Sequence, residues 1–398
     1  MLYGIAAATA ALLLTAALAA LLRTFALRFG VVERMGVPRA RARSRAWGRV
    51  RPVPLLGGVA VVGGTGLVAG VGDWTDVAPL GPEAGRVLVV GIGVALLGLV
   101  ADLWAVPAVV RVAGVGGAAG LVVPYDELGL PGGVLAAAWI VFVVHAFASL
   151  DHADGVMGTV GVITAFALSG CAAVEVMDGL AALLSVLAAA LTGFLMHGWP
   201  PARIVPGRCG ALFAGFVLAS AVVLVQAGRG AGDGLGAGFA LTAVASADAL
   251  LVLVSRWRAG RALLRSAPDH LVHRMRRLGM TRQGVMVVIG VAAFGGALVG
   301  LLIDLGWAGA GAAWWVAGGV ALVVLVGGVR PVSPRGGARP VSPMGGARPI
   351  SRPRRPYPFP SPGARGGATH GRSASRPPYR PERPRPQTPD GLMGAGRG

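Results

Sequence analysis

The sequence predicts an all-α, polytopic integral membrane protein with about eleven transmembrane helices. Hydrophobic residues make up 55% of the 398 residues and charged residues only 13%, whereas a soluble chain is about 25% charged. The mean hydropathy is +0.69. Apolar runs of roughly 20 residues, long enough to cross the hydrocarbon core of a bilayer, recur along the chain. Because these runs are continuous rather than alternating with a period of two, a membrane β-barrel is disfavoured.

The apolar runs can be followed in chain order. The first, "LYGIAAATAALLLTAALAALL", is followed rather than preceded by arginines, which predicts a retained helix with its N-terminus outside instead of a cleaved signal peptide. The fourth run is interrupted by Arg111. The chain has 65 glycines, which suit close approach between membrane helices. The expected spans are approximately residues 2–22, 53–72, 86–101, 104–123, 132–150, 156–174, 178–196, 209–227, 236–255, 284–304 and 312–328.

The distribution of charge orients these spans. The net charge is +19, and every basic residue other than histidine is arginine. Arginines gather in residues 23–51, 197–208 and 256–283, whereas residues 73–85 and 124–131 are acidic or nearly uncharged. Basic short loops mark the cytoplasmic side of a membrane protein. We therefore expect a multi-pass plasma-membrane protein whose basic charge reflects its topology, with no nucleic-acid partner.

The chain divides into a membrane domain, residues 1–328, and a tail, residues 329–398. The tail begins with repeats in "RPVSPRGGARPVSPMGGARPIS" and stays rich in Arg, Pro, Gly and Ser. Because it has no apolar periodicity, it cannot form a core, and we expect it to be disordered and cytoplasmic. It is either a solvated extension or a basic segment that adheres to anionic lipid. The two cysteines, Cys171 and Cys209, provide no disulfide framework.

Four polar clusters are expected on the cytoplasmic face. Their sequences are "RPVPLLGG" (51–58), "GLVADLW" (98–104), "SLDHADG" (149–155) and "RWRAGRALLRSAPDHLVHRMRRLG" (256–279). Carboxylates can bind a divalent cation, while arginine and histidine bind phosphate. The set favours chemistry on a phosphorylated lipid at the inner surface of the membrane. A transporter is the less favoured interpretation, because it would place its polar groups near the bilayer midplane.

These clusters carry a family resemblance. "RPVPLLGG" is similar to a "P-x-P-x-x-G-G" motif, "GLVADL" to "G-x-x-D-D-L", and "HAFASLDHADG" to "N-x-x-N-x-x-D-G-x-D-G". "GFLMHGWPPARIVPGRCGALFAG" follows "G-F-L-x-x-N-x-x-P-A-x-I-F-M-G-D-x-G-S", and "DHLVHRMRRLG" is similar to a histidine loop. In this order, the motifs resemble those of the polyprenyl-phosphate N-acetylhexosamine-1-phosphate transferases, glycosyltransferase family 4. The resemblance spans about residues 30–330.

The resemblance implies a Mg²⁺-dependent transfer of sugar-1-phosphate from a UDP-sugar to polyprenyl phosphate, with release of UMP, in cell-envelope glycan synthesis. It also suggests a homodimer. By position, Asp102 would lie near the attacking lipid phosphate as a base or electrostatic organiser. The implied site residues are Asp102, Asp151, Asp154 and His273 for catalysis, Arg208, His270, Arg256 and Arg261 for substrate binding, and Asp151 and Asp154 for the metal. We expect these side chains around one cytoplasmic cavity.

The chain also departs from the family motifs. Ala101 and Asp102 stand where the family has paired aspartates, and His145 and Ala148 stand where it has two asparagines. Arg208 replaces the metal-binding aspartate, which inverts the charge facing Mg²⁺ and removes the acceptor oxygens. Three alternatives follow: Arg208 binds the diphosphate itself, the remaining aspartates hold a shifted metal, or the protein binds lipid phosphate or a partner protein without turnover.

Several of these residues also have a purely structural interpretation. Asp151 and Asp154 could cap the next helix, and His145 could be a packed, hydrogen-bonded residue inside its span. Asp248, in the ninth expected span, matches a family aspartate but could pair with an arginine. The arginines that follow this span, among them Arg256 and Arg261, could serve only as positive-inside anchors.

Overall fold

A computed structural model describes residues 2–29, 32–33, 53–104, 106–151, 153–227, 231–258, 260 and 270–329. The expected disordered tail, apart from residue 329, lies outside the described residues, as do His152 and Arg261. The elements in chain order are α1 (Leu2–Phe29), β1 (Val32–Glu33), β2 (Val53–Pro54), α2 (Gly57–Trp74), α3 (Gly81–Leu103), α4 (Ala108–Val122), α5 (Tyr125–Leu150), α6 (Val156–Val174), α7 (Asp178–Gly198), α8 (Gly207–Gln226), α9 (Ala231–Leu241), α10 (Ala243–Arg258), α11 (Leu271–Arg277), α12 (Arg282–Asp304) and α13 (Ala312–Val329).

The helices confirm the all-α, polytopic membrane class. Each expected span coincides with a helix or, in one case, a helix pair. Among the described residues, seven helices are long and apolar enough to cross a membrane, or eight if the bent pair α9 and α10 is one span. The helices α4 and α13 are apolar but shorter. The number of eleven spans and the outside position of the N-terminus therefore stay predictions.

The ninth expected span, residues 236–255, is wrong as a single straight helix. It is broken between α9 and α10, which are bent by 78°. At the break the backbone N–H of Thr242 bonds to the carbonyl of Phe239, three residues back, and its hydroxyl donates to the carbonyl of Gly238 at 2.9 Å. The hydroxyl thus satisfies a carbonyl that the bend removes from the regular helical pattern. Hydropathy reports burial and not direction, so it gave no sign of the bend.

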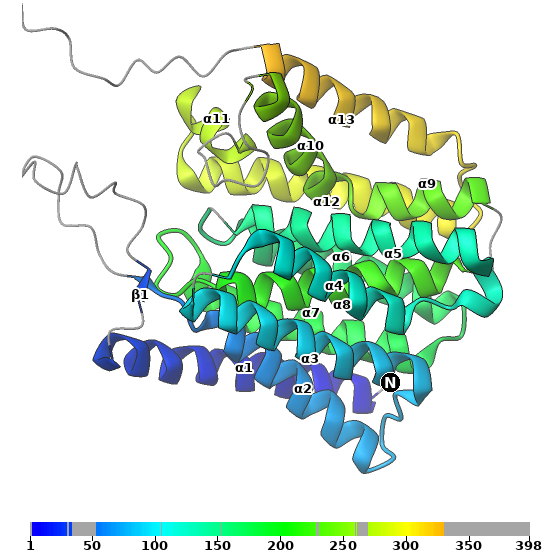
Figure 1. Cartoon of the computed structure of the whole chain (residues 1–398). Helices are drawn as coiled ribbons and strands as arrows, with labels where there is room; N and C mark the ends of the chain where they lie inside the picture. The colour runs from blue at the N-terminus through cyan, green and yellow to red at the C-terminus, as the bar shows by residue number, and fades with distance from the viewer. Residues whose placement is uncertain are drawn as a thin grey trace, which may run out of the picture. The chain divides into compact units, whose positions relative to one another are not determined.

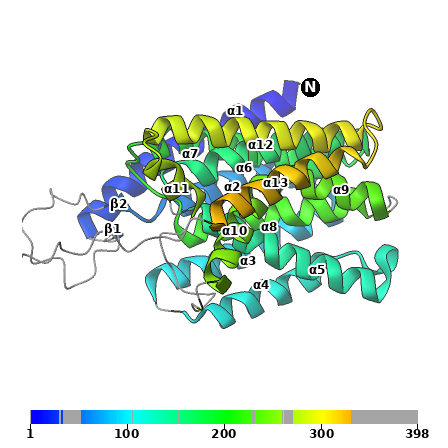
Figure 2. The same ribbon diagram turned by 90° about the horizontal axis from the view of Figure 1, so that it is seen from above.

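The fifth expected span begins later than its helix because α5 is interrupted near its start. Gly129 has a left-handed backbone, with φ +65°, and Pro131 follows it. Glycine adopts this conformation without the steric cost of a Cβ atom. The regular part of α5 then matches the expected residues 132–150. In Figure 2, α4 and α5 lie side by side, as their contacts require.

Helix α8 is the centre of the packed core. It is buried along nearly its whole length and packs against α2, α3, α5 and α6. By contrast, α1 and α13 lie at opposite margins of the helical layers in Figure 1. They expose large apolar side chains such as Leu13, Leu21, Trp314 and Trp315. Exposed apolar side chains on outer helices and a fully packed central helix are what a lipid environment favours.

A two-residue antiparallel pair joins β1 to β2, with Val32 opposite Pro54 and Glu33 opposite Val53. This pair brings the chain after α1 back to the start of α2. It lies at the same end of the helices as α11 (Figure 1). The polar segments of the sequence therefore begin to assemble at this end.

Candidate functional site

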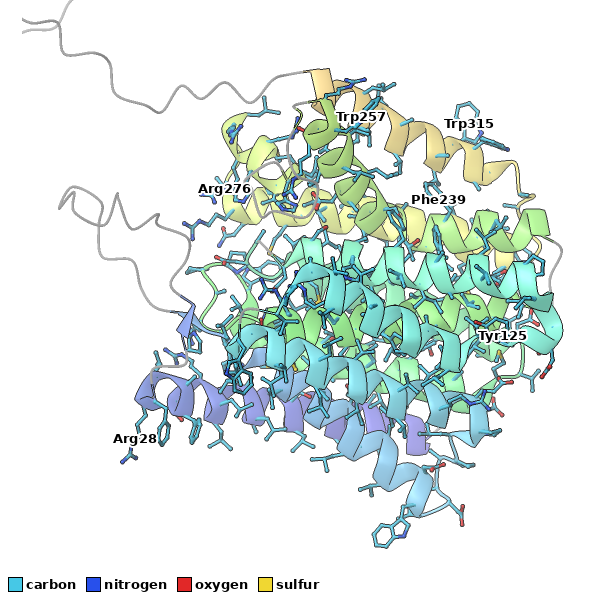
Figure 3. The ribbon with its side chains drawn as sticks, viewed as in Figure 1. Arg28, Tyr125, Phe239, Trp257, Arg276 and Trp315 are labelled. Atoms are coloured by element: carbon cyan, nitrogen blue, oxygen red, sulfur yellow. The ribbon has the colours of Figure 1, made fainter. Side chains whose placement is uncertain are left out.

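The two ends of the helices differ in charge. Arg28, at the end of α1, and Arg276, in α11, lie at the end that carries β1, whereas Tyr125 lies at the opposite end (Figure 3). That opposite end has a cavity of about 200 Å³ whose lining includes Glu83, Glu127 and Glu175. The contrast agrees with the charge pattern that orients the expected spans. We call the end with β1 and α11 the basic end.

The segment between α7 and α8 ties the glycine motif "RPVPLLGG" to the rest of the basic end. The N–H of Val205 bonds to the carbonyl of Pro54, and the N–H of Gly57 bonds to the carbonyl of Val205, each at 3.0 Å. A Cβ atom on Gly57 would lie 2.6 Å from the Val205 oxygen, and one on Gly58 would collide with the backbone of Gly210 and Pro206. The glycine pair thus lets α2 meet the start of α8 backbone to backbone.

Asp102 holds the start of α8 from the end of α3. Its Oδ1 accepts the N–H of Arg208 and its Oδ2 accepts the N–H of Cys209, both at 3.1 Å. The first turn of a helix has N–H groups without partners in the helix, and it attracts negative charge. Close approach is possible because a Cβ atom on Gly98 would lie 2.6 Å from the Arg208 oxygen. Both carboxylate oxygens of the predicted catalytic base are therefore engaged in capping α8.

Positive charges surround Asp102. The Arg208 guanidinium donates from Nη1 to the carbonyl of Ala101 at 2.7 Å. Arg111, from the first turn of α4, lies within electrostatic range of Asp102 and Arg208. His145 of α5 lies within range of Arg111, and its Nδ1 hydrogen-bonds to the carbonyl of Val141 at 2.8 Å. The structure thus agrees with a hydrogen-bonded His145, but it also places this ring beside a cation.

The aspartates of "SLDHADG" lie in the short connection between α5 and α6. Asp151 follows the last residue of α5. Asp154 lies 3.6 Å from the Arg282 guanidinium, between Oδ2 and Nη1, and accepts the N–H of Ala202 at 3.5 Å. The residue before α6 is Gly155, and no side chain caps that helix. Asp154 therefore faces the α7–α8 segment and the start of α12 instead of capping α6.

Asp248 organises the histidine loop, and it is absent from the residues that the motifs single out for catalysis or binding. It is only 2% exposed, and it accepts hydrogen bonds from His270 Nδ1 at 2.9 Å, from the N–H of Leu271 at 2.8 Å and from Ser149 Oγ at 3.0 Å. Among the described residues, its charged partner is a histidine and not an arginine. Its place inside an apolar span was the sequence signal, because buried carboxylates in membrane helices need partners.

The remaining predicted residues divide between the buried and the open part of the basic end. His270 is 4% exposed, and its ring lies 6.4 Å from the half-buried ring of His273. Arg256 is buried at 6% exposure, so it is no solvated anchor. Arg261 lies outside the described residues. The structure brings the described candidates to one end, whereas their arrangement around a single cavity stays a prediction.

The described residues form no Mg²⁺ site made of protein ligands alone. In the described part of the chain, no three His, Cys, Asp or Glu side chains form a group that could hold a metal. Asp102 is occupied by N–H donors and flanked by Arg111 and Arg208, and Asp154 faces Arg282. Mg²⁺ can be held by one or two carboxylates, with water and substrate phosphates completing its octahedral shell, but both of these carboxylates already face cations. The role of Asp151 and Asp154 as metal ligands therefore gains no support from their surroundings.

The fold and its polar end define a membrane protein suited to phosphate-bearing ligands, and comparisons place it in a family. Residues 85–226 match the family model described as "Glycosyl transferase family 4". The matched segment runs from α3 to α8 and contains Asp102, Asp151, Asp154 and Arg208. The segment includes three of the five motifs on which the resemblance rests.

Individual relatives agree with this match. A Streptomyces coelicolor protein provisionally named a glycosyltransferase is 53% identical over 328 residues, which cover 81% of this chain and 77% of that protein. The decaprenyl-phosphate N-acetylglucosaminephosphotransferase of Mycobacterium tuberculosis is 32% identical over 53% of this chain and 62% of its own length. A phospho-N-acetylmuramoyl-pentapeptide-transferase of Synechococcus is 30% identical over 47% of this chain and 54% of its own length. The chain belongs to glycosyl transferase family 4.

Proposed function

We propose that this protein is a membrane phosphoglycosyl transferase that moves a sugar-1-phosphate from a UDP-sugar to polyprenyl phosphate. A phosphate oxygen of the lipid would attack the phosphorus that bears the sugar. The bond from that phosphorus to the bridging oxygen would break, and UMP would leave with the bridging oxygen. The names of the mycobacterial and cyanobacterial relatives support the phosphotransferase class. The UDP-sugar and the cytoplasmic position of the site belong to the proposal.

One observation carries the proposal: a chain of contacts connects the polar segments at the basic end. The α7–α8 segment bonds to Pro54 and Gly57, and the α8 start bonds to Asp102. The same α7–α8 segment meets Asp154 through Ala202. Asp248 then links the end of α5, through Ser149, to the histidine loop. Residues spread over more than half of the chain are thus held in one polar region beside the membrane.

The chain's own residues can supply the electrostatics that phosphoryl transfer requires. Negative charge spreads over the oxygens of the transferred phosphoryl group, and fixed cations that face it lower the barrier. Arg208 is anchored by the carbonyl of Ala101, Arg111 lies within electrostatic range of Arg208 and Asp102, and His273 lies beside the buried His270. The guanidinium groups would hold phosphate oxygens, and Asp102 would keep the start of α8 in place. No step of this scheme runs through a metal ion, since the described residues include no group of three metal-binding side chains.

A second candidate function is a family member that binds phosphate without turnover. The observation in its favour is that both oxygens of Asp102 accept backbone N–H groups. A carboxylate used in this way holds the start of a helix, which is a structural role that requires no proton transfer. This candidate retains the lipid-phosphate ligand and omits the chemistry.

A turnover assay separates the two candidates. The purified protein in nanodiscs would receive polyprenyl phosphate and a panel of radiolabelled UDP-sugars. Transfer of label to the lipid, with an equal amount of UMP released, supports the transferase. UMP release that does not depend on the lipid, or no release with any sugar while the lipid still binds, rejects it and leaves the binding protein.

A further inference from the structure

Three cationic or titratable side chains lie within electrostatic range of one another in sequence, from the start of α8 through α4 to α5. Arg208 lies in its first turn, Arg111 in the first turn of α4, and His145 within about two turns of the end of α5. Arg111 is in electrostatic range of both Arg208 and His145. We call these three residues the cationic cluster. They come from three different helices, so the fold and not one local motif assembles them.

Two polar atoms of the cluster are buried without a partner. Arg111 Nε and His145 Nε2 are shielded from solvent and have no hydrogen-bond partner among the described residues. Burying such groups without a partner is costly, and more so near the hydrocarbon region of a membrane. Asp102 and Asp248 at this end have their carboxylate oxygens engaged, whereas these two nitrogens are left for a ligand to satisfy.

The charge of the cluster selects an anion. Asp102 contributes one negative charge, and Arg111 and Arg208 contribute two positive charges, which leaves a net charge of +1 before His145 is counted. The Asp102 oxygens already accept backbone N–H groups. An incoming cation would meet two guanidinium groups and no free carboxylate. An incoming phosphate would meet arginine donors, which match its oxygens in geometry and charge.

The chemistry of His145 also fits a phosphate. Its Nδ1 bonds to the Val141 carbonyl, so this nitrogen carries a proton. In the neutral ring, Nε2 is then an acceptor for the P–OH of a phosphate monoanion. In the charged ring it is a donor to the dianion. Because the second pKa of a phosphate monoester is about 6, the monoanion and the dianion of the phosphate are both present near neutral pH.

We propose that Arg111, His145 and Arg208 form a phosphate-binding site that works without a divalent metal. The position of Arg208, where the resemblance implies a metal-binding aspartate, supports this substitution of guanidinium for metal. The identity of the phosphate rests on the proposed function: it is the headgroup of a polyprenyl phosphate or the phosphate of a uridine nucleotide. The binding of phosphate by the cationic cluster does not depend on the proposed function.

The test measures binding in excess EDTA. One arm titrates UMP into the protein in nanodiscs by calorimetry, and the other measures retention of radiolabelled polyprenyl phosphate by the detergent-solubilised protein. The variants are Arg111→Gln and Arg208→Gln. Arg86→Gln is the matched control, because Arg86 is exposed on α3 near the opposite end. Arg111→Lys keeps the charge, and thermal unfolding shows whether each variant is folded.

The proposal expects binding that EDTA does not weaken in at least one arm, and that arm identifies the source of the phosphate. Loss of one charge-assisted contact should weaken this binding about tenfold or more in each Gln variant. Arg111→Lys should restore most of it, and Arg86→Gln should match the wild type. Binding that requires Mg²⁺, binding equal in wild type and Arg111→Gln, or no binding in either arm overturns the proposal.

The turnover assay keeps this proposal separate from the proposed function. EDTA-resistant binding without sugar-phosphate transfer would reject the transferase and retain the phosphate site. Transfer that depends on Mg²⁺, without EDTA-resistant binding, would reject the phosphate site and retain the transferase.

Discussion

Asp102 and Asp248 are both aspartates that cap the start of another helix, yet their surroundings differ. Asp248 is 2% exposed and is enclosed by Ser149, His270 and the backbone of Leu271. Asp102 is half-buried and lies beside Arg111 and Arg208 at the basic end. The first carboxylate stabilises a closed junction. The second holds a helix start that lies beside two cations, which under the proposed function would face a phosphate.

The largest effect is expected for Asp248→Ala. The change removes the acceptor for His270 Nδ1 and for the N–H of Leu271 at a buried junction. Such a loss costs about 3 kcal/mol. Thermal unfolding in detergent should show a clear fall in Tm relative to Asp126→Asn, whose carboxylate is exposed on α5. Equal Tm values for the two variants would mean that the Asp248 junction is not structural.

A smaller loss of stability is expected for Gly58→Ala. This variant tests the backbone contact between α2 and the start of α8, the helix that Asp102 caps. The added methyl group would collide with the backbone of Gly210, and overpacking of this kind costs about 2 kcal/mol. Gly70→Ala in the same helix is the matched control, because a Cβ atom there meets nothing within 4 Å. It should leave Tm unchanged or raise it, since alanine favours helix more than glycine does. The opposite order of Tm values would contradict the backbone contact between α2 and α8.

Asp102→Ala should cost less than Asp248→Ala, because its two backbone donors lie in a half-buried position. Loss of a helix cap typically costs about 1 kcal/mol. Asp102→Asn keeps one acceptor oxygen and should recover part of that stability. Hydrogen exchange at the first turn of α8 provides the measurement, with faster exchange in Asp102→Ala. Unchanged exchange there, together with a Tm loss as large as for Asp248→Ala, would remove the distinction between the two aspartates.

The smallest effect is a pH dependence at the histidine loop. Burial lowers the pKa of His273 below its ordinary value of 6.5, and the charges of His270, Arg276 and Arg277 act in the same direction. The unfolded chain therefore binds a proton that the folded chain does not, and stability falls as the pH drops through 6.5 toward the lower folded pKa. Tm measured between about pH 7.5 and 5.5 should fall less in His273→Gln than in the wild type. Parallel curves for the two proteins would contradict the pKa shift.

The sequence predicted the helices well because apolar length is a direct physical requirement of a membrane span. It did not predict the bend at Thr242, since the bend lies inside one apolar run and the local interaction there is one hydroxyl with the carbonyl of Gly238. It also missed the interruption at Gly129, where a left-handed residue and a proline break the start of α5.

The site was predicted in location more than in detail. Charge patterning was enough to predict that Asp102, Arg208 and the histidine loop lie at one end of the helices. The capping of α8 by Asp102 was not predictable, because it depends on the packing of α3 against α8, 106 residues apart in the hydrogen bond to Arg208. In the sequence Arg111 was notable only because it interrupts a span. The fold places it within electrostatic range of Arg208 and Asp102.

The most direct test of a transferase that uses arginines in place of a metal is UMP release in excess EDTA, measured with wild type and Arg208→Asp. The wild type should release UMP in the presence of polyprenyl phosphate and a UDP-sugar, and EDTA should not stop it. Arg208→Asp should lose this activity in EDTA, because the change reverses a charge that faces phosphate. Wild-type release that stops with EDTA and returns with Mg²⁺, or no release under any condition, would contradict the account.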